Sequence, residues 1–193
     1  MGTLHIDDIR SITTIVFIVD IIALFLLLAG IVWSVVRPDR RIWPPPRRRS
    51  WQYFLTWICT FAALGLNAAL LLLDWNSWAF AGGLRFLVGI PVALLGGLLA
   101  IWGVVTIGWR NSSGVRNGFI SSGPYRFTRN PQYLGDNVCF VGLSIVANSE
   151  LLWITHALLA LAFIIAPLSE EVWLQEQYGE KYERYRRNTP RFL

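Results

Sequence analysis

The residues of this chain that are best suited to bind a charged ligand lie together at positions 123–135, in the sequence Gly-Pro-Tyr-Arg-Phe-Thr-Arg-Asn-Pro-Gln-Tyr-Leu-Gly. Pro131 suits the first turn of a helix, where its missing N–H would lack a partner anyway, and Asn130 before it is a favoured N-cap residue. We therefore predict a helix that begins at Pro131. Its free N–H groups and positive dipole end, with Arg126 and Arg129 close by, could bind a carboxylate or a phosphate.

A plainer structure fits the same residues. A capped helix at a membrane surface would bring the two arginines of this segment onto lipid phosphates, without forming a site for a small ligand. The physical features of the segment do not favour either interpretation over the other.

Two blocks of residues resemble a known family. Positions 123–135 resemble the Gly-Pro-Tyr-Arg … Arg-His-Pro-x-Tyr-x-Gly signature of the isoprenylcysteine carboxyl methyltransferase and phospholipid methyltransferase superfamily. A second block follows in the expected order and at the expected separation: Glu170-Glu171, then Tyr178-Gly179, then Thr-Pro-Arg-Phe at positions 189–192. The resemblance covers positions 98–193. It departs at Asn130, where the family usually has a histidine, and asparagine can cap the helix but cannot supply an imidazole.

This resemblance implies an activity and a set of site residues. Members of the superfamily are integral membrane enzymes that use S-adenosylmethionine. The expected protein is therefore a membrane methyltransferase whose acceptor is lipid-like or amphipathic, such as a phospholipid amine, a prenylcysteine carboxylate or a thiol. The expected cofactor-binding residues are Tyr125, Arg126, Asn130, Pro131, Tyr133, Gly135, Glu170 and Glu171, and the expected catalytic residues are Glu171 and Arg129.

The chemistry of methyl transfer suits residues of these types. Displacement at a sulfonium disperses charge, so alignment of the reactants and exclusion of water should supply most of the catalysis, and no metal is needed. The cofactor carboxylate would bind near Asn130 and one of the two arginines, while the two glutamates would bind its ammonium and ribose hydroxyls. Tyr125 and Tyr133 could lie against the sulfonium or the adenine through cation–π contact or stacking.

Composition places these residues in a membrane protein. The chain is 54% hydrophobic and 15% charged over 193 residues, which excludes an ordinary soluble domain. Its net charge of +5 is concentrated beside apolar runs, so membrane lipids are expected partners and nucleic acid is not. Cys59 and Cys139 lie within apolar runs, and we expect free thiols there rather than a disulfide or a metal site.

The apolar runs predict an all-α protein with about five transmembrane helices, at positions 11–36, 51–73, 84–108, 132–148 and 151–168. The last two are short, and the polar turn between them predicts a helical hairpin. Pro167 and the cap-like Ser169 predict that a separate last helix begins there and runs to about residue 187. That helix carries too many charges to span a bilayer.

The sequence predicts one structural domain with two regions. Positions 1–108 form an N-terminal three-helix transmembrane region, and positions 109–193 form the cofactor-binding region. Within the first region, positions 37–50 combine six arginines with a run of prolines, which predicts an extended basic linker that rests on anionic headgroups.

Polar and small residues inside the predicted spans indicate how the helices contact each other. Asp20 and Asn67 are expected to hydrogen-bond across helices, although an intramembrane carboxylate such as Asp20 could instead be functional. Glycines between positions 84 and 108 favour the close approach of a neighbouring helix over that of a ligand. Pro91 in the same run predicts a kink.

The placement of arginine and lysine predicts the orientation in the membrane. Positions 37–50, 109–135 and 169–193 carry six, four and five of the 17 basic residues, which leaves Arg10 and Arg85 for the other side. By the positive-inside rule the three segments are cytoplasmic, the N-terminus is outside and the C-terminus is inside. The two motif blocks would then meet at the cytoplasmic face and form one site there.

Two other functions stay open from the sequence. Tyr-Leu-Gly-Asp at positions 133–136 is similar to a block of the NADPH-dependent sterol reductases, although the chains of that family are longer and have more spans. A non-catalytic membrane protein that retains the fold is also compatible with the residues, because Asn130 replaces the usual histidine. Binding of S-adenosylmethionine or of NADPH would distinguish these alternatives.

Overall fold

The computed structural model describes residues 6–78 and 82–192, and these residues form helices and no strand. The helices are α1 (Ile6–Val36), α2 (Trp51–Leu73), α3 (Leu84–Ser112), α4 (Pro131–Ala147), α5 (Glu150–Tyr178) and α6 (Glu180–Asn188), with short 3-10 helices η1 (Pro38–Arg40) and η2 (Gly123–Arg126). In this part of the chain, four helices, α1, α2, α3 and α5, are long and apolar enough to cross a bilayer. The prediction of an all-α membrane protein is confirmed.

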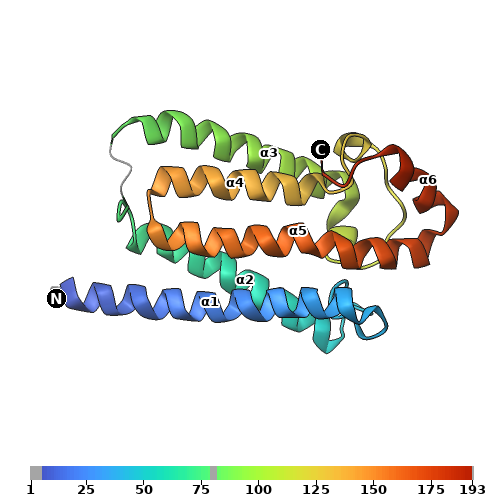
Figure 1. The fold of residues 1–193 in the computed structure, drawn as a ribbon, viewed down its shortest axis with the longest axis horizontal. Helices are drawn as coiled ribbons and strands as arrows, with labels where there is room; N and C mark the ends of the chain where they lie inside the picture. Colours follow the sequence, from blue (N-terminus) through green and yellow to red (C-terminus); the bar gives the residue numbers. More distant parts are fainter. Residues whose placement is uncertain (1–5, 79–81, 193) are drawn as a thin grey trace.

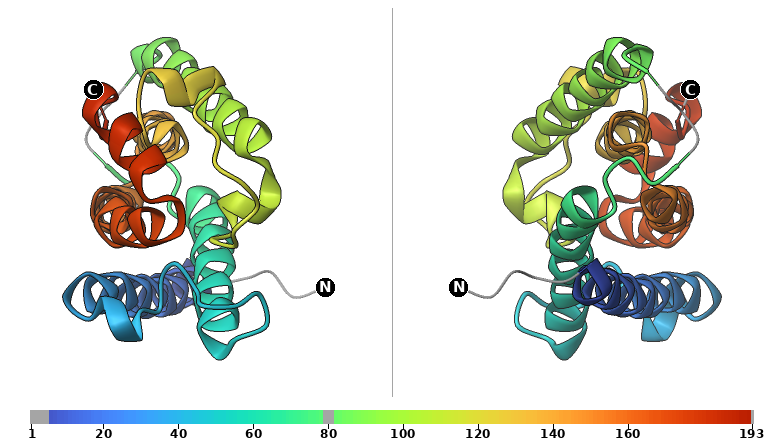
Figure 2. Two further views of the ribbon diagram at one scale, coloured as in Figure 1. Left: turned by 90° about the vertical axis from the view of Figure 1, so that its right-hand side faces the viewer. Right: turned by 90° about the vertical axis from the view of Figure 1, so that its left-hand side faces the viewer.

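The long helices run roughly along one axis, so the molecule has two distinct ends (Figure 1). α4, which has 17 residues, lies between α3 and α5, and α1 packs against α2 and α5. Viewed from the end, α1 and α2 lie opposite α3 and α4 (Figure 2). The linker between α1 and α2, the loop before α4, helix α6 and the C-terminal segment all lie at the same end, away from the first turns of α1.

The predicted hairpin of α4 and α5 is confirmed. Asn148 ends α4 in the left-handed conformation, with φ 49°. Ser149 caps α5, because its hydroxyl oxygen accepts a hydrogen bond from the N–H of Leu152 at 3.1 Å. The two helices therefore run antiparallel with almost no chain between them.

The last helix begins later than predicted. α5 continues through Pro167, and the Ser169 hydroxyl donates to the carbonyl oxygen three positions earlier instead of capping a new helix. The chain turns at Gly179, whose φ of +52° is readily accessible to glycine, and α6 follows. Glu170 and Glu171 therefore lie towards the end of one long helix rather than at the start of a short one.

α3 and α4 touch through their backbones. An ideal Cβ atom on Gly96 would lie 2.3 Å from the backbone nitrogen of Cys139, and one on Gly142 would lie 2.2 Å from that of Ala93. Gly135, which we predicted to bind a cofactor, belongs to the same contact, because its Cβ would lie 2.4 Å from a backbone nitrogen of α3. Any side chain at these positions would overlap the opposite helix, so the glycines serve helix packing.

The irregular backbone of α3 lies at Gly108 rather than at Pro91. Gly108 has φ 76° and ψ 155°, which lie outside the helical region and favour a residue without a Cβ atom. Pro91 lies inside the helix without such a break, so the kink expected there stays a prediction, and the helix ends at Ser112, four residues later than predicted.

A buried chain of hydrogen bonds joins α1, α2 and α5. Asn67 of α2 donates from Nδ2 to Oδ2 of Asp20 in α1 at 2.8 Å, and its Oδ1 accepts from the Thr155 hydroxyl of α5 at 2.6 Å. All three side chains are buried. The predicted hydrogen bonds across helices are confirmed. They fix the axial register of the three helices, because a shift would leave these polar groups unpaired among apolar side chains.

Replacement of Gly96 by alanine should destabilise the protein, whereas the same replacement at the adjacent Gly97 should not. The carbon added at Gly96 would overlap the α4 backbone, but one added at Gly97 would lie 3.8 Å from the Cys139 sulfur, an ordinary contact. We expect Gly96→Ala to lower the free energy of unfolding by about 1–3 kcal/mol. Thermal unfolding in detergent measures both variants, and equal effects would contradict the backbone contact.

Candidate functional site

A cavity opens at the end of the bundle where α3, α4 and α5 meet the loop before α4. Its volume is about 880 Å³, including space that is open to solvent. The walls come from three parts of the chain that are far apart in the sequence, within positions 43–44, 107–133 and 170–185. The two blocks of residues that the sequence singled out therefore border one cavity.

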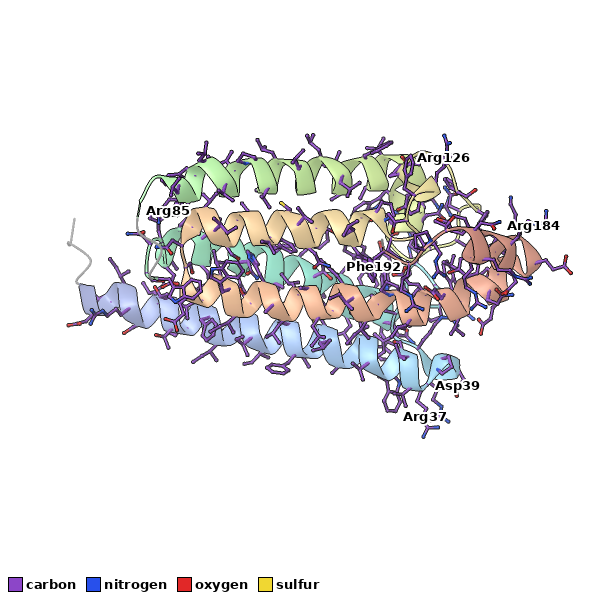
Figure 3. All side chains as sticks on the ribbon, turned by 45° about the horizontal axis from the view of Figure 1, so that its top comes forward. Arg37, Asp39, Arg85, Arg126, Arg184 and Phe192 are labelled. Carbon is purple, nitrogen blue, oxygen red and sulfur yellow. The ribbon has the colours of Figure 1, made fainter. Side chains whose placement is uncertain are left out.

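Six of the predicted site residues line this cavity and three do not. The lining residues among them are Tyr125, Arg129, Asn130, Tyr133, Glu170 and Glu171. Arg126 is exposed, with its guanidinium carbon 5.9 Å from the centre of the Phe127 ring (Figure 3). Pro131 is buried at the start of α4, and Gly135 packs on α3.

Glu171 is bound by two arginines. Its carboxylate accepts hydrogen bonds from Arg191, at 2.6 Å from Nε to Oε1 and at 2.9 Å from Nη2 to Oε2. Nη1 of Arg129 lies 3.1 Å from Oε1, and the side chains of Glu171 and Arg129 are each 10% exposed. The hydrogen bonds to Glu171 raise the pKa of Arg191 above its usual value. The negative charge of Glu171 is therefore balanced by arginines within the protein.

The C-terminal segment is fastened to the entry of α4. The backbone N–H of Arg129 donates to the carbonyl oxygen of Pro190 at 2.9 Å. The carbonyl oxygen of Arg191 accepts from the Thr128 hydroxyl at 3.0 Å and from Asn130 Nδ2 at 2.9 Å. The side chain of Asn130 therefore does not cap α4, although the helix begins at the predicted residue. The side-chain amide of Asn130 instead donates a hydrogen bond, because the C-terminal segment brings the carbonyl oxygen of Arg191 within reach.

Glu170 is bound by two neutral donors. The indole N–H of Trp43 donates to Oε1 at 2.6 Å, and the Tyr133 hydroxyl donates to the same oxygen. Trp43 comes from the linker between α1 and α2, where the N–H groups of residues 42 and 43 donate to the Ser34 hydroxyl at 2.8 and 2.9 Å. The expectation that the linker rests on headgroups is wrong for this part, because Trp43 and Pro44 are buried against the site.

Aromatic side chains form the wall of the cavity next to α6. The Phe119 ring lies 5.3 Å from that of Tyr178 and 5.5 Å from that of Tyr185, centre to centre. The Tyr185 hydroxyl donates to the carbonyl oxygen of Tyr125 at 2.7 Å, which ties α6 to η2. Burial raises the pKa of Tyr182 to about 12, so this phenol stays protonated at neutral pH.

The cavity has two polar sides of different character. At Glu171 one carboxylate faces two guanidiniums, and Nε of Arg129 is buried with no hydrogen-bond partner among the described residues. At Glu170, the hydrogen bonds made by described residues both reach Oε1, which leaves Oε2 available. A zwitterionic ligand suits this arrangement, because its anionic group could bind at Arg129 and its cationic group at Glu170.

Two residues that shape this site were not identified from the sequence. Arg191 belongs to the Pro-Arg-Phe ending, and the need of a buried carboxylate for a cationic partner could have pointed to it. Trp43 carried no such signal, because a tryptophan among arginines and prolines is typical of an interfacial segment.

About half of the chain, residues 84–181, matches the model of a family described as phospholipid methyltransferase. The chain belongs to the phospholipid methyltransferase family. The match begins with α3 and ends in α6, so it contains Arg129, Glu170 and Glu171, and it confirms the resemblance seen in the two motif blocks. No curated protein and no solved structure matches the chain significantly. The family match and the long apolar helices together support a membrane methyltransferase.

Replacement of Arg191 by alanine should loosen the C-terminal segment of this family member. Glu171 would keep one arginine and lose the other, and we expect the free energy of unfolding to fall by about 1–3 kcal/mol. The backbone amide of Arg129, which donates to Pro190, should then exchange with deuterium faster. Arg187→Ala is the matched control, because Arg187 is 74% exposed and makes a surface ion pair at 3.5 Å. Unchanged protection of the amide in Arg191→Ala would contradict this role.

Proposed function

We propose that this protein is a membrane-embedded methyltransferase that uses S-adenosylmethionine and acts on a lipid-like or amphipathic acceptor. The observation that carries the proposal is the cavity with Arg129 on one side and the Glu170 carboxylate on another, in a chain of the phospholipid methyltransferase family. The methionine part of S-adenosylmethionine is a zwitterion. Its two charged groups match these two sides of the cavity.

The residues of the cavity fit this cofactor. Its carboxylate would supply an acceptor for Nε of Arg129, which is buried without a partner within residues 6–78 and 82–192. Its ammonium or ribose hydroxyls would bind Oε2 of Glu170. The rings of Tyr125 and Phe119 border the same space and could stack on the adenine or lie against the sulfonium.

The proposal changes the role of Glu171. We expected this residue to bind the cofactor or to act in catalysis, but its two oxygens already accept hydrogen bonds from Arg191, and Arg129 lies beside one of them. Glu171 would therefore act by holding Arg129 in place. Arg129 is the residue of this pair that would contact the cofactor carboxylate.

Alignment and exclusion of water are what the chain would contribute to the reaction. S-adenosylmethionine would supply an electrophilic methyl group to the acceptor heteroatom, with its sulfur leaving as a neutral thioether and any proton on the acceptor passing to water. Arg129 and Glu170 would hold the methionine part at two points, which fixes the direction of the methyl group. The aromatic wall at Phe119 and the buried Trp43 would keep water from the reacting atoms.

The position of the cavity supports an amphipathic acceptor. The cavity lies at one end of the long apolar helices, so a lipid-like molecule could keep its chain in the bilayer and present its polar group to the site. A phospholipid amine, a prenylcysteine carboxylate and a lipophilic thiol all meet this condition. The family match favours methyl transfer over reduction with NADPH.

We further propose that the site faces the cytoplasm. Arg37, Arg126 and Arg184 lie at the end of the molecule that holds the cavity, and Arg85 lies at the opposite end (Figure 3). This separation follows the uneven distribution of basic residues in the sequence. Such a distribution orients a membrane protein with its basic end inside.

Purified protein should bind S-adenosylmethionine and its demethylated product, and it should not bind NADPH. Arg129→Gln should weaken binding by about tenfold to a hundredfold, because it removes a charged donor from a mostly buried position. Arg126→Gln is the matched control, since this arginine is exposed only three positions earlier. Calorimetry gives the dissociation constants, and transfer of labelled methyl groups into lipid extracts and small thiols gives the acceptor class.

Two results of this experiment would contradict the proposal. Binding of NADPH without binding of S-adenosylmethionine would favour a reductase. Binding of S-adenosylmethionine with no methyl transfer to any lipid or thiol would favour the non-catalytic alternative.

A cysteine introduced at Ser121 should react with an impermeant thiol reagent only from the cytoplasmic side, and one at Ser77 should react only from the other side. Both serines are exposed and lie at opposite ends of α3. The native Cys59 and Cys139 are replaced by alanine to remove background labelling. Reaction of both introduced cysteines from the same side would show that α3 does not cross the membrane.

A further inference from the structure

A hydrogen bond reaches the cavity from outside the region that matches the family. We infer that Trp43 is a positioning residue for Glu170: its indole N–H holds one carboxylate oxygen so that the other faces the cavity and binds the cofactor. This inference rests on the proposed function. It extends the site to the linker between α1 and α2, which precedes the matched residues 84–181.

Trp43 is held in place by both of the helices that the linker joins. The backbone N–H groups of Ile42 and Trp43 donate to the buried hydroxyl of Ser34, near the end of α1. The Trp43 ring packs edge-on against Trp57 of α2, with centres 6.5 Å apart and planes at 75°. Trp43 is 8% exposed. Its indole N–H therefore has a fixed direction, and that direction is towards Glu170.

The hydrogen bonds on Glu170 favour one orientation of its carboxylate. Nε1 of Trp43 lies 2.6 Å from Oε1, and the Tyr133 hydroxyl of α4 donates to the same oxygen. Two donors from different segments restrict the rotation of the carboxylate. Within the described part of the chain, neither bond involves Oε2. Because both donors are neutral, they leave the charge of an ionised Glu170 unmatched, so a cationic group or a hydroxyl of a ligand could bind it.

Packing alone does not explain the hydrogen bond of Trp43. Trp57 belongs to the same aromatic cluster, and its Nε1 is buried with no hydrogen-bond partner in residues 6–78 and 82–192. Burial of a tryptophan in this cluster therefore does not require a partner for its N–H group. The N–H of Trp43, in contrast, reaches a residue that lines the cavity.

A double-mutant cycle tests this inference. Trp43→Phe removes the N–H and keeps an aromatic ring, Glu170→Gln removes the charge, and a third protein carries both changes. Trp153→Phe is the matched control, because it makes the same substitution at a tryptophan whose buried N–H has no partner among the described residues and which does not line the cavity. Calorimetry with S-adenosylhomocysteine gives the dissociation constant of each protein, and the thermal midpoint reports whether each protein folds.

We expect Trp43→Phe to weaken binding about tenfold and Trp153→Phe to leave it unchanged. The double variant should bind as weakly as Glu170→Gln alone, because Trp43 acts only through Glu170. Unchanged binding in Trp43→Phe, or additive losses in the double variant, would overturn the inference while the binding of the wild-type protein still supports the proposed function. A wild-type protein that does not bind S-adenosylhomocysteine would overturn both.

A second variant covers the case in which Trp43→Phe does not fold. Ser34→Ala removes the hydroxyl that holds the linker and leaves the Trp43 ring unchanged. It should weaken binding in the wild-type background and should have no effect in the Glu170→Gln background. Unchanged binding in the first background, or the same loss in both, would overturn the inference.

Discussion

The carboxylate of Glu171 holds the site together. It lies between the guanidiniums of Arg129 and Arg191, and it therefore joins the end of α5 to the entry of α4 and to the C-terminal segment. A carboxylate whose side chain is only 10% exposed is unfavourable unless its charge is matched. These three segments cannot separate without leaving that charge unpaired. Because two of them also supply much of the cavity wall, the shape of the cavity depends on these ion pairs.

The ion pairs depend in turn on how closely α3, α4 and α5 pack. Gly96 and Gly142 let the backbones of α3 and α4 touch, which fixes α4 without relying on the conformations of long side chains. The tight turn at Asn148 and Ser149 then returns α5 along α4. Arg129 and Glu171 stand at the two open ends of this hairpin. The hairpin thus brings them together although its whole length separates them in the sequence.

The parts of the fold that could be predicted carry local signals. Apolar runs predicted the spans, and Pro131 marked the start of α4 correctly. The helix boundary predicted at Ser169 is wrong, because α5 continues through this residue. In an apolar helix, continued backbone hydrogen bonding outweighs the local preference of a serine for a cap position. Asn130 borders the cavity but does not cap the helix. Trp43 could not be assigned, because its role depends on a linker that folds back onto a helix more than a hundred residues later.

Adjacent glutamates have different roles in this site because successive residues of a helix face different directions. Glu171 faces two cations, so its charge is balanced within the protein, where it holds Arg129 and the C-terminal segment in place. Glu170 faces the neutral donors Trp43 and Tyr133, which do not balance the charge of its ionised form, so in the proposed function a ligand would do so. Two neighbouring carboxylates repel each other unless one is neutralised. The arginines around Glu171 therefore also make it less costly to keep Glu170 ionised at the cavity. In the proposed function, the C-terminal segment would therefore support ligand binding without contacting the ligand.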